Sequence, residues 1–364
     1  MVYLYVTIRI MHGGIMKPHT KKLLNFLFIF GTLAIVILIN VNGQEMSGAV
    51  DALRAISPVW IVLCLMAYLL YIGFDALSLW FYLKRAHQPI SMGRALFVTI
   101  IGLYYSNITP GATGGQPMQI YYLNKSKVPI GLGTSALTVK YFCFQFMLMV
   151  VGTILWLTHG PFIAEQVGSS MWILVVGYVY NAVAVCGIVL MAVSRRVVWF
   201  LMRLIIRLGT KLRFIKDPDM TATKWRDGLE LFHSSIMTIK KKPFDFLLQL
   251  LMGMLQLLSQ MLVIFFIYHA FKLSGVGYTQ LTALAVMLYI SASYTPLPGA
   301  SGAQEGVFSL YFAQIFPDGI RLMALLLWRF FTYYVSLILG AVVTVANGFV
   351  PGKKKAAKPD KKPE

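Results

Sequence analysis

Long stretches without a charged residue constrain this chain more than any other feature of its sequence. Eight stretches of 20 or more residues contain no Asp, Glu, Lys or Arg; they span residues 24–44, 55–74, 95–124, 141–164, 166–194, 246–271, 273–304 and 330–352. A helix needs about 20 mainly apolar residues to cross a bilayer. Because 58% of all residues are hydrophobic and only 12% are charged, the sequence predicts an all-α polytopic membrane protein rather than a soluble enzyme. The alternating segments of about ten residues that form a membrane β-barrel do not occur.

Two of these stretches are interrupted by the same Pro- and Gly-rich motif. Residues 110–116 read PGATGGQ and residues 298–304 read PGASGAQ, so five of seven positions are identical and a sixth exchanges Thr for Ser. Pro and Gly at this density end a helix. Irregular backbone at membrane depth is tolerated only where it is buried in protein or lines a wet cavity. We therefore expect two hairpins, each a helix, a break and a half-helix, over residues 95–124 and 281–312.

The distribution of positive charge predicts how the chain lies in the membrane. If the N-terminus is cytoplasmic and both hairpins return to the side they came from, 27 of the 32 Lys and Arg residues are cytoplasmic and three are external. If each broken segment crossed once instead, the twelve cations of loop 194–243 would move outside, against the positive-inside rule. The sequence thus predicts about six full spans, two re-entrant hairpins and two cytoplasmic termini. Two crossings per broken segment give the same count, so that alternative stays open.

This topology divides the chain into three parts. A cytoplasmic segment, 1–23, precedes a transmembrane domain, 24–349, and a basic cytoplasmic tail, 350–364, follows it. Within the domain, a first half (57–193) and a second half (244–349) flank the basic loop 194–243. We expect 24–40 to be a retained span rather than a cleaved signal peptide, and either Met1 or Met16 to be the true start. We assign the net charge of +19 to these basic segments facing an anionic lipid surface, not to nucleic acid; in the loop, Val197–Leu208 is expected to lie in the interface.

The repeat extends beyond the motif itself. Lys140 lies 30 residues after Pro110, and Arg329 lies 31 residues after Pro298. A glycine follows each cation, at Gly152 and Gly340. Because the predicted hairpins enter from opposite sides, the two halves are expected to be inverted, an arrangement that secondary transporters use to bind substrate near the midplane. The simpler alternative is that the small residues only let helices pack closely.

Four charged residues fall in or beside the apolar segments. They are Asp75, Lys140, Glu305 and Arg329, and burying them unpaired in a membrane is costly. We expect Lys140 and Arg329 to bind an anionic head group, and Asp75 and Glu305 to form an ion-pair or proton site. Half-helix N-termini after the breaks would offer N–H groups to phosphate. The break residues of the predicted substrate site are Asn107, Thr109, Pro110, Gly111, Thr113, Gly114, Gly115, Gln116, Pro298, Gly299, Ser301, Gly302, Gln304 and Glu305. The alternative is a structural ion-pair network without a ligand.

Three runs of residues resemble a known family. Residues 105–117 (YSNITPGATGGQP), 296–306 (PLPGASGAQEG) and 327–334 (LWRFFTYY) are similar to signatures of the lysylphosphatidylglycerol synthase transmembrane, or flippase-like, family. The resemblance covers roughly residues 20–350. It implies a translocase for a polar-headed phospholipid such as lysylphosphatidylglycerol, placed in a bacterial cell membrane and contributing to resistance against cationic antimicrobial peptides.

In that family the domain forms the N-terminal part of the bacterial multiple peptide resistance factor, whose soluble C-terminal domain transfers lysine from aminoacyl-tRNA to phosphatidylglycerol. This sequence ends at Glu364 without such a domain, so we expect translocation from it rather than lysine transfer. No catalytic, metal-binding or cofactor motif occurs, and the six histidines have no ligand spacing.

Two other functions stay open at this point. One is a phosphatidylglycerol lysyltransferase that acts through a separate aminoacyl-lipid synthase. The other is an ion-coupled transporter of a small solute, with Glu305 or Asp75 carrying the proton. The expected ligand is a membrane phospholipid. A second copy of the chain, in a homo-oligomer, is a further partner that the sequence leaves open.

Overall fold

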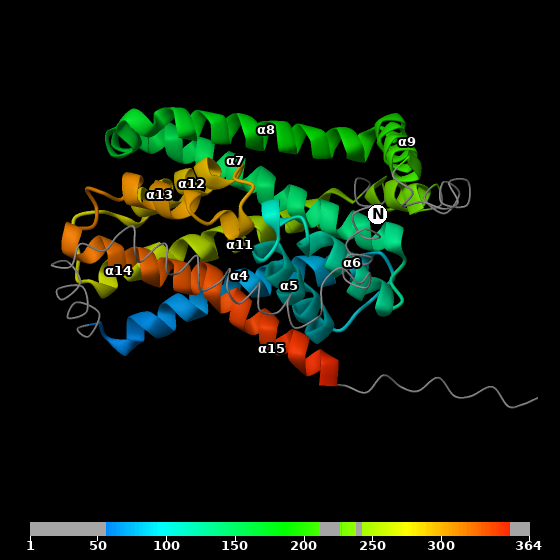
Figure 1. Cartoon of the computed structure of the whole chain (residues 1–364), viewed down its shortest axis with the longest axis horizontal. Helices are drawn as coiled ribbons and strands as arrows, with labels where there is room; N and C mark the ends of the chain where they lie inside the picture. The colour runs from blue at the N-terminus through cyan, green and yellow to red at the C-terminus, as the bar shows by residue number, and fades with distance from the viewer. Residues whose placement is uncertain (1–55, 212–225, 227, 238–241, 350–364) are drawn as a thin grey trace, which may run out of the picture.

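The computed structural model describes residues 56–211, 226, 228–237 and 242–349. Within these residues every regular element is helical and no strand occurs, which confirms the all-α prediction (Figure 1). The predicted span at 24–40 and the basic tail at 350–364 lie outside the described residues, as does much of the basic loop.

Four helical segments are long and apolar enough to cross a membrane: Pro58–Arg85, Ile130–Val193, Pro243–Ala270 and Asp318–Ala346. The first and third are α4 and α11, which both begin with proline, a residue without an N–H group that suits the first turn of a helix. The second comprises α7 (Ile130–Val167) and α8 (Met171–Val193), which fold back on each other at Gly168 (Figure 1). The chain is therefore a multi-pass membrane protein by the length and composition of its helices.

Each motif break is flanked by two helices that pack together. Helix α5 (Met92–Asn107) leads to a short turn at Pro110–Ala112 and then to α6 (Gly115–Lys125). Helix α12 (Tyr278–Ala292) leads to the turn at Pro298–Ala300 and then to α13 (Ala303–Tyr311). In both cases the two helices contact each other. These helix–break–helix units lie where the sequence predicted hairpins.

The last span is continuous but changes its winding. Helix α14 (Asp318–Arg329) passes through a π-helical turn, Phe330–Tyr334, into α15 (Val335–Phe349). A π-turn inside an α-helix is often found at a functional site, and this one begins directly after Arg329.

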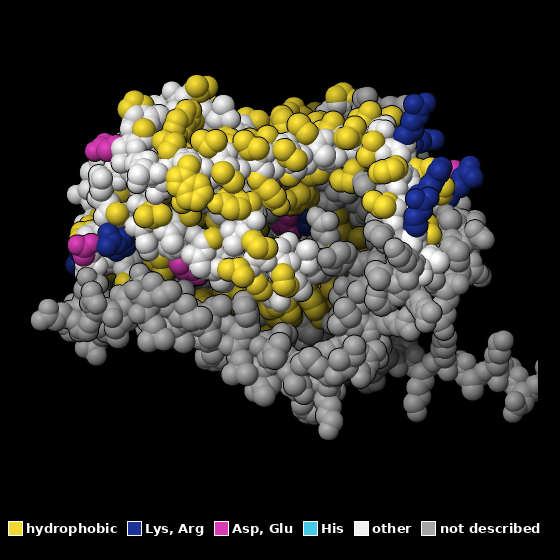
Figure 2. All heavy atoms as spheres, turned by 45° about the horizontal axis from the view of Figure 1, so that its top comes forward, with side chains coloured by type: hydrophobic (Ala, Val, Ile, Leu, Met, Phe, Trp, Pro, Cys, Tyr) yellow, Lys and Arg dark blue, Asp and Glu magenta, His cyan; other side chains and the backbone are white. Residues whose placement is uncertain are grey.

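On the other side of the molecule, α9 (Arg195–Lys211) turns away from the end of α8. Lys and Arg side chains gather at that end of the molecule (Figure 2).

In the core, helices of the first half pack against helices of the second half. Helices α4 and α11, one from each half, pack along each other at the centre. Helix α12 of the second half packs on α7 of the first, and α5 of the first half packs on α15 of the second. A Cβ atom on Gly152 would lie 2.8 Å from Ile290 of α12, and one on Gly340 would lie 2.3 Å from Tyr104 of α5. The two equivalent glycines therefore play the same part: each lets its own helix approach a helix of the other half closely.

Candidate functional site

The two motif breaks share the backbone conformation of their Gly-Ala pair and meet each other. Gly111 and Gly299 both have φ of 58°, in the left-handed region that glycine adopts without the cost that other residues incur. The alanine after each, Ala112 and Ala300, is also left-handed, with φ of 54° and 49°. The Gly111 N–H donates a hydrogen bond of 2.8 Å to the Pro296 carbonyl. Segments 185 or more residues apart in the sequence are thus joined through their backbones.

Arg329 is the centre of the second break. Its Nε lies 2.8 Å from Glu305 Oε1, and its Nη1 donates to Gln304 Oε1 at 2.6 Å. Its Nη2 donates to Ser301 Oγ at 3.1 Å and to the Gly299 carbonyl at 3.3 Å. Arg329 as a whole residue is only 3% exposed. Four groups of one motif therefore hold a single buried guanidinium, whose planar fork of donors matches them.

Glu305 has two tasks in this arrangement. It is the third residue of α13, and its Oε2 accepts a hydrogen bond of 2.8 Å from the Gly302 N–H at the start of that helix. A carboxylate at a helix N-terminus is stabilised by the helix dipole. The other oxygen pairs with Arg329, which also lies 4.4 Å from the ring centre of Tyr333. The second break is therefore closed around one ion pair.

The other two buried charges form a second pair on different helices. Lys140 Nζ of α7 lies 2.8 Å from Asp75 Oδ2 of α4, and the other Asp75 oxygen accepts from Gln256 Nε2 of α11 at 3.2 Å. Lys140 is 8% exposed and Asp75 is 7% exposed. Among the described residues, no hydrogen bond or ion pair joins Lys140 to the first break. The structure therefore brings Arg329 together with its own motif and places Lys140 against another helix.

The first break is held by neutral groups. Thr109 Oγ1 accepts from the Gly114 N–H at 2.8 Å and donates to the Tyr105 carbonyl at 2.6 Å. Asn107 Nδ2 donates to Ser336 Oγ of α15 at 2.6 Å. These contacts fix the first break to its own helix and to the last span.

The remaining predicted residues divide by exposure. A Cβ on Gly115 would lie 1.9 Å from Ser106 Oγ, so this glycine lets α6 approach α5 closely. Gly114 is buried with it. The exposed residues of the two motifs are Pro110, Gly111, Thr113, Gln116 and Gly302, and Pro298 is half-buried.

Buried amides form a polar network that sequence reasoning did not identify. Asn181 of α8 accepts a hydrogen bond from Gln145 of α7 and donates to Ser293 Oγ at 2.7 Å, just before the second break. Gln260 of α11 donates to the hydroxyl of Tyr289 at 2.5 Å. Amide side chains inside charge-free stretches were the available signal, since a buried polar group requires a partner.

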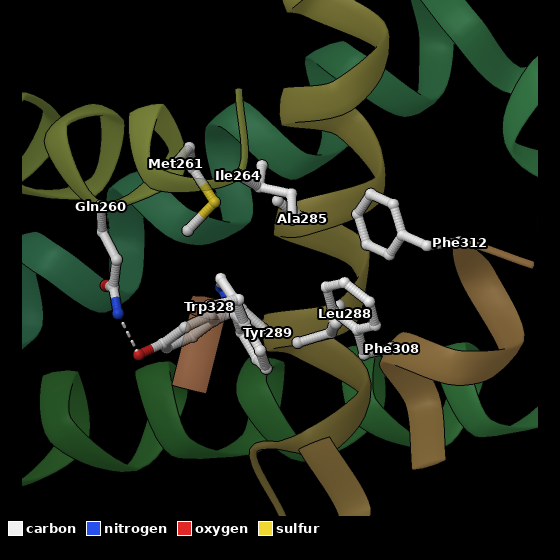
Figure 3. Close-up of a pocket in the computed structure, with 9 residues that line it drawn as sticks. All are labelled: Gln260, Met261, Ile264, Ala285, Leu288, Tyr289, Phe308, Phe312 and Trp328. Carbon is white, nitrogen blue, oxygen red and sulfur yellow. Dashed lines mark hydrogen bonds between the residues drawn. The ribbon is translucent and has the colours of Figure 1, made fainter. Parts of the chain in front are cut away.

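A small cavity lies where α11 and α12 meet the half-helix α13. Gln260 and Tyr289 point toward each other at one side of this cavity, and Phe308 and Phe312 lie at its other side (Figure 3). The cavity measures about 10 Å³, which is room for roughly one water molecule. Figure 2 shows a hollow near the middle of one face, with an acidic and a basic side chain at its bottom.

Comparison with known proteins gives a consistent result. The family model described as "Lysylphosphatidylglycerol synthase TM region" matches residues 23–340. A UPF0104 membrane protein from Archaeoglobus fulgidus is 21% identical over 308 residues, which cover 78% of this chain and 85% of the relative. Another UPF0104 membrane protein, from Methanocaldococcus jannaschii, is 21% identical over 352 residues, which cover 94% of this chain and 98% of the relative.

Proposed function

The chain belongs to the family of lysylphosphatidylglycerol synthase transmembrane regions, and from this premise we propose that it translocates a phospholipid with a polar head group across a cell membrane. The observation that carries the proposal is the meeting of two equivalent Pro-Gly-Ala breaks, joined from Gly111 to Pro296, with a buried ion pair beside the second. Broken helices that meet inside a bundle are how membrane transporters build a binding site at midplane depth.

The topology that goes with this proposal has six spans, two re-entrant hairpins and both termini in the cytoplasm. The packing between the halves supports it, because α5 of the first half packs on α15 of the second, and α12 of the second half packs on α7 of the first. The distribution of Lys and Arg supports the orientation, since 27 of 32 fall on one side in this arrangement. Each half would then present its break from an opposite face of the membrane.

The chemistry of the two cations suits a phosphate. Arg329 offers a planar set of donors, and arginine is favoured where phosphate oxygens are bound in pairs. Glu305 already occupies one edge of that fork, so a lipid phosphate would compete with the carboxylate rather than enter an empty site. Lys140 has Asp75 as its one ion-pair partner among the described residues. An anionic head group could therefore exchange with a carboxylate at each cation in turn.

Passage of a head group requires the breaks to separate, because Arg329 is buried and paired with Glu305 inside the second break. The direct links between the breaks and the opposite half are few. They include the Gly111–Pro296 backbone hydrogen bond and the bonds of Asn107 to Ser336 and to the Tyr333 hydroxyl. We propose that the hairpins move apart by breaking these links while each ion pair is replaced by lipid.

The test is translocation by the purified chain in liposomes. Fluorescent lysylphosphatidylglycerol is followed between the leaflets by adding a membrane-impermeant quencher. Arg329→Ala and Lys140→Ala should slow transfer by about tenfold or more, because each removes a charge-assisted contact of about 1.5–3 kcal/mol. The matched controls are Phe330→Ala and Tyr141→Ala, the neighbours of the two cations, which are 44% and 41% exposed and should transfer lipid like the unchanged chain.

Each alternative function has its own outcome in the same liposomes. Transfer no faster than in empty liposomes, with a chain that elutes as a folded species, would overturn the proposal. Incorporation of lysine from charged tRNA into lipid by this chain would instead assign lysyltransferase activity. Uptake of a water-soluble solute driven by a proton gradient, and lost in Asp75→Asn or Glu305→Gln, would assign an ion-coupled transporter.

A further inference from the structure

A second cavity lies away from both breaks, where α7, α8 and α11 meet. It measures about 260 Å³, close to the lower end of the range of roughly 300–1,000 Å³ for small-molecule pockets. Its walls include Val139 and Phe142 of α7, Ile188 and Ala192 of α8, and Phe246 of α11. The walls are apolar almost throughout, so the cavity suits a hydrocarbon chain rather than a head group.

One side of the cavity is covered by a short helical segment, residues 228–237. Ile236 of this segment lines the cavity, and His233 Nδ1 lies 3.1 Å from the carbonyl oxygen of Ala192 on α8. The contact ties the covering segment to the end of α8. The cavity is therefore a binding pocket with walls on several sides, and not simply the outer surface of a lipid-facing helix.

Cations stand at the same end of these helices. Lys242 directly precedes Pro243, a residue of the cavity wall, and is exposed. Arg195 and Arg196 begin α9 three and four residues after Ala192, and both are exposed. Figure 2 shows Lys and Arg side chains gathered at this end of the molecule. An apolar cavity with exposed cations near it matches the two parts of an anionic phospholipid.

We propose that this cavity binds one acyl chain of an anionic phospholipid, with the phosphate of that lipid at Arg195, Arg196 and Lys242. The inference goes beyond translocation and requires only that the chain lies in a membrane. A cation near an anionic lipid contributes about fivefold in binding. The site should therefore prefer phosphatidylglycerol over the zwitterionic phosphatidylcholine.

The experiment uses the full chain in vesicles that carry trace phosphatidylglycerol or phosphatidylcholine with a photoreactive acyl chain. After irradiation, peptides bearing lipid are mapped by mass spectrometry. Adducts from phosphatidylglycerol should concentrate on residues 138–142, 188–192 and 243–246, and should exceed those from phosphatidylcholine about fivefold or more. The combined variant Arg195→Gln, Arg196→Gln, Lys242→Gln should abolish this preference.

A matched pair on one helix tests the cavity itself. Ala192→Trp fills the cavity and should reduce the adducts there several-fold, with Ala192→Leu as a smaller filler if the tryptophan variant does not fold. Ala182→Trp makes the same change on the exposed side of α8 and should leave the adducts unchanged. Adducts spread evenly along α8, or undiminished in Ala192→Trp, would overturn the proposal.

Two further outcomes bear on it separately. Cys186 is exposed on α8, so a disulfide between two copies, formed in the vesicles together with exclusion of lipid from α8, would assign this face to a second copy of the chain and overturn the lipid-binding pocket. Loss of lipid transfer in the Lys140 and Arg329 variants, with the adduct pattern intact, would leave the pocket in place. Failure of translocation in the unchanged chain would likewise not affect it.

Discussion

The two breaks share a left-handed Gly-Ala pair but stabilise the start of their half-helices in different ways. At the first break, the Gly114 N–H is satisfied by Thr109, which precedes it in the chain. At the second break, the equivalent Gly302 N–H is satisfied by Glu305, which follows it. Neither break has the residue that the other one uses. Leucine stands at 297, the position equivalent to Thr109, and Pro117 stands at the position equivalent to Glu305.

The presence of a carboxylate at only one break determines which residue pairs with each buried cation. Because Glu305 brings a carboxylate to the second break, Arg329 is bound by its own motif. Pro117 brings none, so Lys140 pairs with Asp75 of α4 and the first break stays neutral. A duplicated backbone has therefore diverged into one break closed on a charge and one that is largely exposed. The same substitution made in both halves should have unequal effects.

The largest difference is expected from removing one carboxylate in each half. Glu305→Gln keeps the size of the side chain but leaves the guanidinium of Arg329 buried without its counter-ion, which costs about 3–5 kcal/mol of unfolding free energy. Asp75→Asn should cost less, because a lysine can lose its proton and an arginine does not. Unfolding in mixed micelles with increasing sodium dodecyl sulfate measures both.

A control separates charge from packing in the second half. The double variant Glu305→Met, Arg329→Met removes both charges and should recover much of the lost stability. If Asp75→Asn proves as destabilising as Glu305→Gln, the two pairs are equivalent and the contrast between the breaks is wrong.

The next difference concerns the equivalent glycines. Gly299→Ala places a Cβ 2.1 Å from the Tyr333 ring at a φ of +58°, so left-handed strain of about 1–2 kcal/mol adds to overpacking of about 1–3 kcal/mol. Gly111→Ala has the same φ, but its nearest neighbour is Thr113 at 3.8 Å, so only the strain remains. The free energy of unfolding of the two variants should differ by the overpacking alone, and equal losses would show that the second break is not tightly closed.

Much of this fold is predictable from sequence, for a definite physical reason. Charge-free length predicts membrane helices, and the Pro-Gly motif predicts a break, because both depend on local composition and backbone chemistry. The repeated motif also indicated that Glu305 follows a break and that Lys140 and Arg329 are equivalent in position. These features need no knowledge of which helices touch.

The partners of the buried groups could not be predicted in the same way. Asp75 reaches Lys140 because α4 and α7 are adjacent, and Gln256 joins them from α11; neither adjacency is encoded in the spacing of the motifs. The contact between Gly111 and Pro296 depends on how the halves dock. Tertiary packing, which places residues far apart in the chain side by side, supplies this part of the site.

The equivalent glutamines give a smaller contrast. Gln304 accepts a hydrogen bond of 2.6 Å from Arg329, and its replacement by alanine should cost about 1.5–3 kcal/mol because the lost bond is to a charged group. Gln116 is exposed, and Gln116→Ala should change stability by no more than about 0.5 kcal/mol. The detergent unfolding assay measures both, and a destabilised Gln116→Ala would indicate a contact at the first break that forms in another conformation.

The smallest expected effect tests the neutral cap of the first break. Thr109→Val preserves the shape of the side chain but removes the acceptor of the Gly114 N–H, a loss of about 1 kcal/mol for a helix cap. Thr113→Val, two residues past Gly111, removes only an exposed hydrogen bond to the Pro110 carbonyl and should be nearly neutral. A loss at Thr109 that approaches that of Glu305→Gln would mean that the start of α6 carries more of the fold than its lack of charge suggests. The Thr109 hydroxyl and the Glu305 carboxylate satisfy equivalent N–H groups in the two halves. The difference between the stability losses of Thr109→Val and Glu305→Gln therefore measures what the buried charge adds to a break.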